Sequence, residues 1–348
     1  MPFRLAQRPY RLPFRTPVNT AHGPWAVREG ILVRVEDEAG CSGLGEVAPI
    51  PWFGTCTVDE AGEFLTSLGG VVDPSILDSI PAGLACVRGA LAAALAGVER
   101  AARIREGTTR PGDPLPVRPH AQVAALLPAG RAALARARER AELGFRCLKW
   151  KVGVGDAADE MALLEDLLAV LPAGARLRLD PNGAWDRRLA CRWLERCADL
   201  PVEFVEQPVA PDSRGAVDTL LGLASDFPTP LALDESVVAD ADIEAWLERG
   251  WRGLFVLKTS LLADPEARLA RLHAAGAGVV FSSALETRVG ARRLFDLALT
   301  WQGEARALGT GVWPLFGDPR MEGPVAAPFV TADDISKLNT EDTWNALN

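Results

Sequence analysis

Acidic residues recur at regular intervals in the second half of the chain, each at the end of a short apolar run. Asp180 ends the run Arg176–Asp180, and Glu206 and Asp234 end similar runs at intervals of 26 and 28 residues. Such intervals are typical of one strand followed by one helix. Three carboxylates at neighbouring strand ends would raise one another's pKa, and a divalent cation relieves that repulsion. Because the three side chains supply only oxygen and no Cys or His stands nearby, the sequence predicts a Mg²⁺ site formed by Asp180, Glu206 and Asp234.

Lysines stand on both sides of these acids. Lys149 and Lys151 end the preceding apolar run, and Lys258 ends the run that follows Asp234. Because side chains alternate along a strand, Lys149 and Lys151 share one face and Trp150 points the other way. A lysine beside another lysine and near a metal has its ammonium form disfavoured, so its pKa falls and it can act as a base. The metal would stabilise charge on a substrate carboxylate, so the set predicts proton abstraction from the adjacent carbon, with Lys151 as the base.

Each of these residues has a simpler explanation when it is taken alone. A single acid at a strand end is often a structural hydrogen-bond acceptor, a Lys-x-Lys end is often a solvated edge, and Lys258 could be a surface lysine. The order of lysines and acids at consecutive strand ends favours catalysis, and it disfavours a barrel that only binds or scaffolds. Glu235 follows Asp234 directly, so we expect it to face away from the metal and to support the site or the fold.

The secondary-structure elements that position these residues alternate regularly after residue 120. Short runs of β type alternate with Ala-, Leu- and Arg-rich helical segments at a period of roughly 22–30 residues. This pattern predicts an α/β fold with a modified (β/α)7β barrel of the TIM type, whose active site forms at the carboxyl ends of the strands. An open doubly wound sheet is the alternative, but the chain lacks both a G-x-G-x-x-G turn and a P-loop. The expected strands are Ala121–Leu126, Arg146–Val152, Arg176–Asp180, Val202–Glu206, Leu231–Asp234, Leu254–Lys258, Val279–Ser283 and Ala307–Gly309.

The N-terminal part reads as strands followed by helices, which predicts a compact α+β unit. Glu29–Glu36 and Gly43–Val47 form a predicted hairpin, and Val58–Leu68 and Ser75–Arg103 have helical spacing. The proline-rich segment Glu106–Pro119 is the predicted boundary. We therefore expect a capping domain over residues 1–115, a catalytic barrel over 116–312, and a return to the capping domain over 313–348.

Composition limits the partners and the compartment. The 348-residue chain is 48% hydrophobic and carries a net charge of −9, so it repels nucleic-acid phosphates and anionic membranes. We expect no nucleic-acid partner and no membrane span, and the arginine-rich start is not a secretory signal. The six cysteines form no C-x-x-C pair, which favours reduced thiols and a cytoplasmic enzyme acting on a small carboxylate substrate. The sequence leaves open whether it works as a monomer or a homo-oligomer.

Longer sequence motifs contain or neighbour the predicted site residues: Gly45–Gly54, Leu179–Trp185, Phe204–Pro208 and Ser282–Glu286. With the lysines and acids, they resemble the enolase superfamily, and within it the muconate-lactonizing subgroup, which carries a base lysine on each side of the metal. The resemblance covers almost the whole chain. It implies that the three acids ligate Mg²⁺, that Lys151 and Lys258 flank the substrate, and that Lys149 tunes Lys151.

Within that subgroup, the chain is similar to the o-succinylbenzoate synthase family. The similarity implies syn-dehydration of 2-succinyl-6-hydroxy-2,4-cyclohexadiene-1-carboxylate to o-succinylbenzoate through an enediolate, in menaquinone or phylloquinone biosynthesis. It also implies that Lys151 removes the α-proton and then protonates the leaving hydroxyl on the same face. Lys258 lies opposite, where its ammonium can stabilise the enediolate through a cation–π contact with the ring.

The resemblance also suggests substrate contacts and related activities. The loop Thr20–Gly23 would close over the substrate and exclude water, and its His22 would contact the substrate carboxylate. N-succinylamino acid racemases and dipeptide epimerases share the lysines and the metal set, and muconate cycloisomerisation is a further alternative. Dipeptide epimerases typically carry an Asp-x-Asp near the last strands, which this chain lacks. The suggested substrate-binding residues are Arg178, Asn182, Ser282, Ser283 and Gly309.

Overall fold

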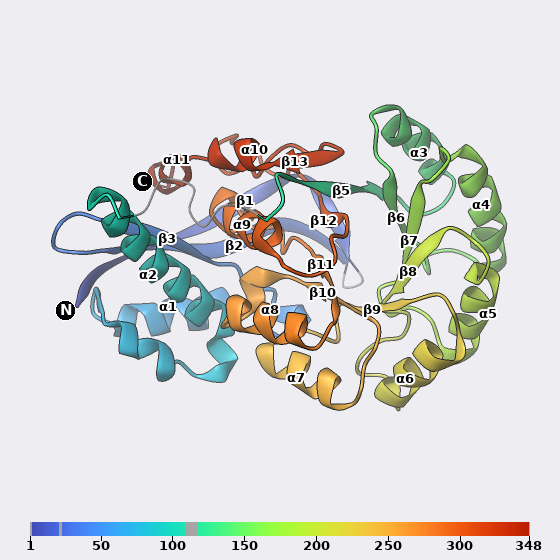
Figure 1. The fold of residues 1–348 in the computed structure, drawn as a ribbon, viewed down its shortest axis with the longest axis horizontal. Coiled ribbons are helices and arrows are strands. Elements are labelled where there is room, and N and C mark those ends of the chain that lie inside the picture. Colours follow the sequence, from blue (N-terminus) through green and yellow to red (C-terminus); the bar gives the residue numbers. More distant parts are fainter. Residues whose placement is uncertain (1, 21–22, 109–116, 348) are drawn as a thin grey trace.

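The computed structural model describes residues 2–20, 23–108 and 117–347 (Figure 1). A sheet with two helices forms one side of the molecule, and a ring of strands surrounded by helices forms the other. The predicted boundary between residues 115 and 116 lies outside the described residues. The boundary between residues 312 and 313 stays a prediction.

The N-terminal sheet, which we call the cap sheet, has four antiparallel strands in the order β3-β2-β1-β4. The predicted hairpin is confirmed, because Ile31 of β2 pairs with Val47 of β3. The long first strand was not predicted, because three prolines interrupt its pattern. Proline is tolerated here because β4 pairs with only the first residues of β1 and leaves most of that edge open. The strands are β1 (Phe3–Thr20), β2 (Gly23–Glu36), β3 (Ser42–Val47) and β4 (Val71–Val72).

Two α-helices accompany the cap sheet, α1 (Val58–Ser67) and α2 (Ala85–Arg105). The single helix predicted over Ser75–Arg103 is wrong at its start, because two 3-10 turns, η2 (Pro74–Asp78) and η3 (Ala82–Leu84), precede α2. Pro81 lies between these turns and breaks the helical pattern.

Helix α2 packs closely on β3. A Cβ atom at Gly45 would lie 2.0 Å from the Ala90 carbonyl oxygen, so only glycine permits this approach. In the described residues, one segment, Ala82–Arg105, is long and apolar enough to cross a membrane by length and composition. Its apolar side, including Val87 and Leu91, is buried in the cap, which is equally typical of a core helix.

The larger unit is a ring of parallel strands in sequence order from β5 to β11, with β12 beside β5. An isolated parallel bridge between Ser282 and Gly309 closes the ring. In the described chain one helix follows each strand except the last, so the predicted (β/α)7β barrel is confirmed. The strands are β5 (His120–Leu127), β6 (Cys147–Lys151), β7 (Arg176–Asp180), β8 (Val202–Glu206), β9 (Leu231–Leu233), β10 (Leu254–Leu257), β11 (Gly278–Phe281) and β12 (Leu308–Gly311). The helices are α3 (Ala132–Glu142), α4 (Ala157–Val170), α5 (Arg187–Cys197), α6 (Ala216–Asp226), α7 (Asp240–Glu248), α8 (Pro265–Ala274) and α9 (Arg288–Thr300).

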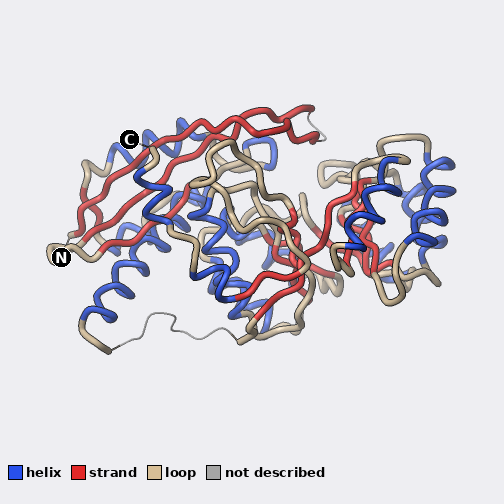
Figure 2. The backbone as a smooth tube through the Cα atoms, turned by 90° about the horizontal axis from the view of Figure 1, so that it is seen from above, coloured by secondary structure: helices blue, strands red, loops and turns tan. Residues whose placement is uncertain are grey.

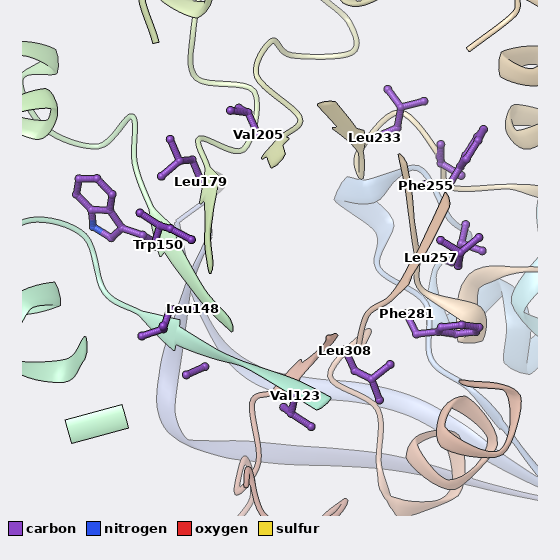
Figure 3. Close-up of a cluster of buried hydrophobic side chains, with 14 of the residues drawn as sticks. Val123, Leu148, Trp150, Leu179, Val205, Leu233, Phe255, Leu257, Phe281 and Leu308 are labelled. Atoms are coloured by element: carbon purple, nitrogen blue, oxygen red, sulfur yellow. The ribbon is translucent and has the colours of Figure 1, made fainter. Parts of the chain in front are cut away.

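Alternation along the strands divides the barrel residues into two sets. One set points outward and is buried under the helices; Figure 3 labels Val123, Leu148, Trp150, Leu179, Val205, Leu233, Phe255, Leu257, Phe281 and Leu308. The other set fills the interior, where Phe204, Val256 and Val280 belong to one buried cluster. Trp150 is fully buried in the outer set, so Lys149 and Lys151 take the inner face, as predicted.

The C-terminal segment contacts both units. Strand β13 (Phe329–Thr331) pairs with β5 of the barrel, and α10 (Ala332–Ser336) follows it. Helix α11 (Thr340–Asn345) reaches the cap sheet, where Trp344 packs with Tyr10 and Leu32. From above, the ribbon of β1 and β2 runs along one side of the barrel (Figure 2). An antiparallel bridge from Phe14 to Phe316 joins that ribbon to the segment after β12.

Candidate active site

The predicted lysines and acids lie at the carboxyl ends of five consecutive strands. Lys151 is the last residue of β6 and stands opposite Asp180, the last residue of β7. Glu206 ends β8, whereas Asp234 and Lys258 directly follow β9 and β10. The three acids are all buried, with exposed fractions of 2% to 6%. The barrel therefore brings the predicted set together at one mouth.

Ammonium groups neutralise these buried acids. The Nζ atom of Lys149 lies 3.0 Å from Oδ2 of Asp180 and 2.6 Å from Oε1 of Glu206. Lys258 forms an ion pair with Asp234 through its Nζ atom. The three acids thus stand side by side, and the lysines that flank them at β6 and β10 give each acid an ammonium partner.

The electrostatics of the cluster follow from burial and from these pairs. Burial raises the pKa of Glu206 to about 8, and the charges of Asp180 and Asp234 also raise it while Lys149 lowers it. Burial acts to lower the pKa of Lys149, but the three carboxylates together raise it above its usual value. In this arrangement the pKa of Lys149 is thus raised, whereas the fall in pKa expected for a lysine beside a bound metal ion stays a prediction. A fixed positive charge on Lys149 beside Lys151 agrees with the tuning role that the resemblance implies.

A divalent cation is the group that such an acid set accommodates. Among the described residues, no three Asp, Glu, His or Cys side chains stand close enough to form a coordination site as arranged. The ammonium groups of Lys149 and Lys258 lie against the carboxylate oxygens instead. The donor chemistry nevertheless fits Mg²⁺, because all donors are carboxylate oxygens and because burial, with the neighbouring carboxylate charges, raises the pKa of Glu206. Ligation by Asp180, Glu206 and Asp234 stays a prediction.

The cap contributes an aromatic side chain to the barrel mouth. Phe53, in the 3-10 turn η1 (Pro51–Phe53), has its ring centroid 4.2 Å from the Nζ atom of Lys258. This is a cation–π contact, and it adds to the ion pair that holds the Lys258 ammonium group. Trp52, the preceding residue, packs edge-on against Trp25 at 4.6 Å. The sequence did not predict a role for Phe53, although the motif Gly45–Gly54 contains it.

Two neighbours support the acid set. Gln207 is fully buried, and its Oε1 atom accepts hydrogen bonds from the backbone N–H groups of Asp234 and Ser236, both at 3.1 Å. Asn182 donates through Nδ2 to Oε1 of Glu235 at 2.9 Å. Burial raises the pKa of Glu235 to about 7, and the charges of Asp234 and Asp180 contribute. Asn182 and Glu235 thus brace one another across two strand ends, and a substrate contact by Asn182 stays a prediction.

The end of β11 holds the predicted succinyl contacts. Ser282 faces Gly309 of β12 across the closing bridge, and the Ser283 N–H group donates to the Gly309 carbonyl oxygen at 3.2 Å. The Ser283 hydroxyl donates to Glu286 at 3.2 Å and accepts from the Leu285 N–H group at 2.9 Å. The three predicted residues therefore lie together, and the local hydrogen bonds fix Ser283.

Arg178 lies deeper in the barrel. It stands opposite Lys149, one layer below Asp180, and is 1% exposed. Its Nε atom donates to Glu203 at 2.8 Å, and its guanidinium stacks on Phe204 at 4.7 Å. These contacts assign Arg178 to the core beneath the site, and its contact with substrate stays a prediction.

Other features lie away from this cluster. A cavity of about 400 Å³ between cap and barrel is lined in part by Gly45, Arg100 and Arg293, and one of about 580 Å³ lies beside Glu60. None of the predicted site residues lines either cavity. We place the site by its convergent charged groups, since these supply the chemistry. His22 lies outside the described residues.

Comparisons with known proteins agree with this fold and cluster. Residues 132–284 match the family model described as "Enolase C-terminal domain-like". An o-succinylbenzoate synthase of Thermosynechococcus vestitus is 42% identical over 88% of this chain and 91% of its own length. Another, of Edwardsiella ictaluri, is 30% identical over 83% of this chain and 84% of its own length.

Solved structures extend the similarity to three dimensions. The o-succinylbenzoate synthase of Thermosynechococcus elongatus, complexed with Mg in its active site, superposes with a TM-score of 0.83 at 37% identity and covers 99% of both chains. The L-Ala-D/L-Glu epimerase of Bacillus subtilis gives 0.80 at 20% identity over 94% of this chain and 95% of its own, which shows the fold alone. On the strength of the close relatives, the chain belongs to the o-succinylbenzoate synthase family within the enolase superfamily.

Proposed function

We propose that this protein is an o-succinylbenzoate synthase that dehydrates 2-succinyl-6-hydroxy-2,4-cyclohexadiene-1-carboxylate in a Mg²⁺-dependent reaction. The observation that carries the proposal is the order of lysines and acids at five consecutive strand ends, in a chain 42% identical to a named synthase. The product is aromatic, and its formation is a step toward menaquinone or phylloquinone. We place the reaction in the cytoplasm, to which the six unpaired thiols are suited.

In the proposed mechanism, Lys151 carries both proton transfers. Its neutral amine takes the α-proton, so the C–H electrons move into an enediolate of the substrate carboxylate. The resulting Lys151 ammonium then protonates the leaving hydroxyl on the same face, the C–O bond breaks, and water and the aromatic ring form. Mg²⁺ bound by Asp180, Glu206 and Asp234 would supply the positive charge that stabilises the enediolate.

Lys258 is proposed as a fixed cation on the opposite face. Its Nζ atom forms an ion pair with Asp234 and lies over the Phe53 ring, and these two contacts fix its position. An ammonium held in this way stabilises the enediolate, whereas a racemase needs a second lysine that accepts and returns protons. Racemisation of N-succinylamino acids is the alternative, because such substrates share the succinyl group that Ser282, Ser283 and Gly309 are proposed to contact.

Turnover of the cyclohexadiene substrate by the purified protein, with and without EDTA, tests the proposal. We expect EDTA to abolish the activity and Mg²⁺ to restore it. Lys151→Ala should lower kcat by about a thousandfold or more, because one residue carries both proton transfers. Wild-type turnover in that variant would show that the base is another residue.

Lys258→Arg separates the two activities. Arginine keeps the positive charge but cannot exchange protons at neutral pH. Dehydration should therefore survive the change better than racemisation of an N-succinylamino acid. Equal losses of both activities would contradict the fixed-cation role.

A further inference from the structure

Arg28, on strand β2 of the cap, is a buried cation whose hydrogen bonds go to backbone carbonyl groups. Its side chain is 1% exposed, and no Asp or Glu among the described residues lies within ion-pair distance of it. Burying a guanidinium without a carboxylate is unfavourable unless its N–H groups are satisfied. Here they are, by the carbonyl oxygens of Glu29 (2.8 Å), Ala48 (2.6 Å), Pro49 (2.8 Å) and Leu285 (3.2 Å).

Two of the cap carbonyl groups that accept hydrogen bonds from Arg28 belong to residues just before the cap segment that reaches the barrel mouth. Only Ile50 separates Ala48 and Pro49 from the turn that carries Phe53. The ring of Phe53 lies 4.2 Å from the Nζ atom of Lys258. The Arg28 guanidinium therefore fixes the base of the segment that delivers an aromatic ring to the Lys258 ammonium group.

The fourth carbonyl belongs to the barrel side of the mouth. Leu285 has a φ of 59°, a left-handed conformation that leucine rarely adopts. The Ser283 hydroxyl accepts from its N–H group, and Arg28 donates to its carbonyl oxygen. These two bonds hold the strained residue from both sides. Arg28 thus stabilises the turn that follows the proposed succinyl contacts.

A separate bond set ties the cap to the start of α9. Glu46 is 6% exposed and accepts hydrogen bonds from the Tyr10 hydroxyl, the Thr287 N–H and hydroxyl groups, and the Gly290 N–H group. It thereby caps a helix that begins 242 residues later at Arg288. Because these four bonds do not involve Arg28, the cap stays attached to the barrel when Arg28 is replaced.

We infer that Arg28 is a positioning residue that holds the Phe53 segment of the cap and the Ser283–Leu285 turn of the barrel in fixed relation across the substrate site. The inference rests on the proposed function for its kinetic consequences. Loss of the guanidinium frees both segments. The bound substrate then makes weaker ground-state contacts with the Phe53 segment through its ring and with the Ser283–Leu285 turn through its succinyl group. The proton transfers at Lys151 do not depend on either segment, and the ion pair with Asp234 keeps the Lys258 ammonium group in place when the Phe53 segment is freed. The expected signature is a higher KM with little change in kcat.

The test compares Arg28→Met with Arg34→Met. Arg34 lies on the same strand and binds Glu341 at 2.9 Å and Ser42 at 3.0 Å, away from the mouth. We expect Arg28→Met to raise KM for the cyclohexadiene substrate about tenfold with kcat within about threefold of wild type. Arg34→Met should keep KM within about twofold. Arg28→Lys, which keeps the charge but not the planar fork, should give an intermediate KM.

Three outcomes would overturn the inference. These are a wild-type KM in folded Arg28→Met, an equal rise in Arg34→Met, or a loss confined to kcat. If Arg28→Met does not fold, Arg28→Gln is held to the same criteria. If the wild-type protein does not turn over the substrate, the proposed function fails, and crystal structures of wild type and Arg28→Met decide the inference. Unmoved Phe53 and Leu285 segments would then refute it.

Discussion

Glu286 is expected to make the protein less stable as the pH rises. Its side chain is fully buried, and Oε1 has no hydrogen-bond partner among the residues that the structure describes, while Oε2 accepts from the Ala284 N–H group and the Ser283 hydroxyl. Burial raises its pKa from 4.5 to about 7, and the charge of Glu46 adds to this while Arg28 opposes it. Below pH 4.5 the group is protonated in both the folded and the unfolded chain. Between pH 4.5 and 7 only the folded chain keeps the proton, so unfolding becomes progressively easier.

The magnitude follows from the size of the shift. A change from 4.5 to about 7 corresponds to about 3 kcal/mol of unfolding free energy, lost by pH 8. Glu286→Gln cannot ionise, so its stability relative to wild type should grow by about this amount between pH 4.5 and 8. Urea unfolding of both proteins, followed by tryptophan fluorescence, measures the difference. Glu106→Gln, on an exposed site, is the control and should track wild type. A constant difference between Glu286→Gln and wild type across this range would refute the reasoning.

Two further predictions concern a buried ion pair and a close packing contact. Arg178→Met should lower the free energy of unfolding by about 3 kcal/mol, because it leaves the buried carboxylate of Glu203 without its closest ion-pair partner. Urea unfolding measures this loss, and adding Glu203→Leu should recover part of it; no recovery would contradict the pairing. Gly45→Ala should cost about 1–3 kcal/mol, since its Cβ atom would lie 2.0 Å from the Ala90 carbonyl oxygen. Gly83→Ala, where a Cβ atom meets nothing within 4 Å, should be neutral, and equal melting temperatures for the two alanine variants would contradict the packing argument.

The barrel could be predicted because its signals are local. Each strand is a short apolar run between helical segments, so the predicted Arg176–Asp180 and Val202–Glu206 coincide with β7 and β8. Strand β1 could not be predicted in this way. Its prolines remove the alternation that marks a strand, and only tertiary pairing with β2 reveals that the backbone is extended. The start of α2 was missed for a different reason, since the two 3-10 turns on either side of Pro81 continue the apolar spacing of the helix without being part of it.

The candidate site likewise has a part that local sequence patterns predict and a part that they do not. The positions of Lys151, Asp180 and Glu206 follow from strand ends, because parallel strands place their carboxyl ends at one rim. The partners of those residues do not follow from any local pattern. Phe53 lies over Lys258 although about 200 residues separate them, and nothing in the sequence around Arg28 marks it as buried. Contacts between cap and barrel depend on how two separate units pack, which no local pattern encodes.

This difference between strand-end residues and their long-range partners bears on how one fold supports several reactions. Proteins named as epimerases share the fold of this chain, so the fold alone does not determine whether a proton is exchanged or a hydroxyl is lost. In the proposed mechanism, the strand-end acids and lysines of this chain serve the removal of a proton next to a carboxylate, a step that several reactions can share. The choice among them must then lie in what surrounds the substrate beyond those strand ends. In this chain we propose the Phe53 ring against Lys258 and the turn after Ser283 as that surrounding, and a single guanidinium, that of Arg28, is bonded to the segments that carry both.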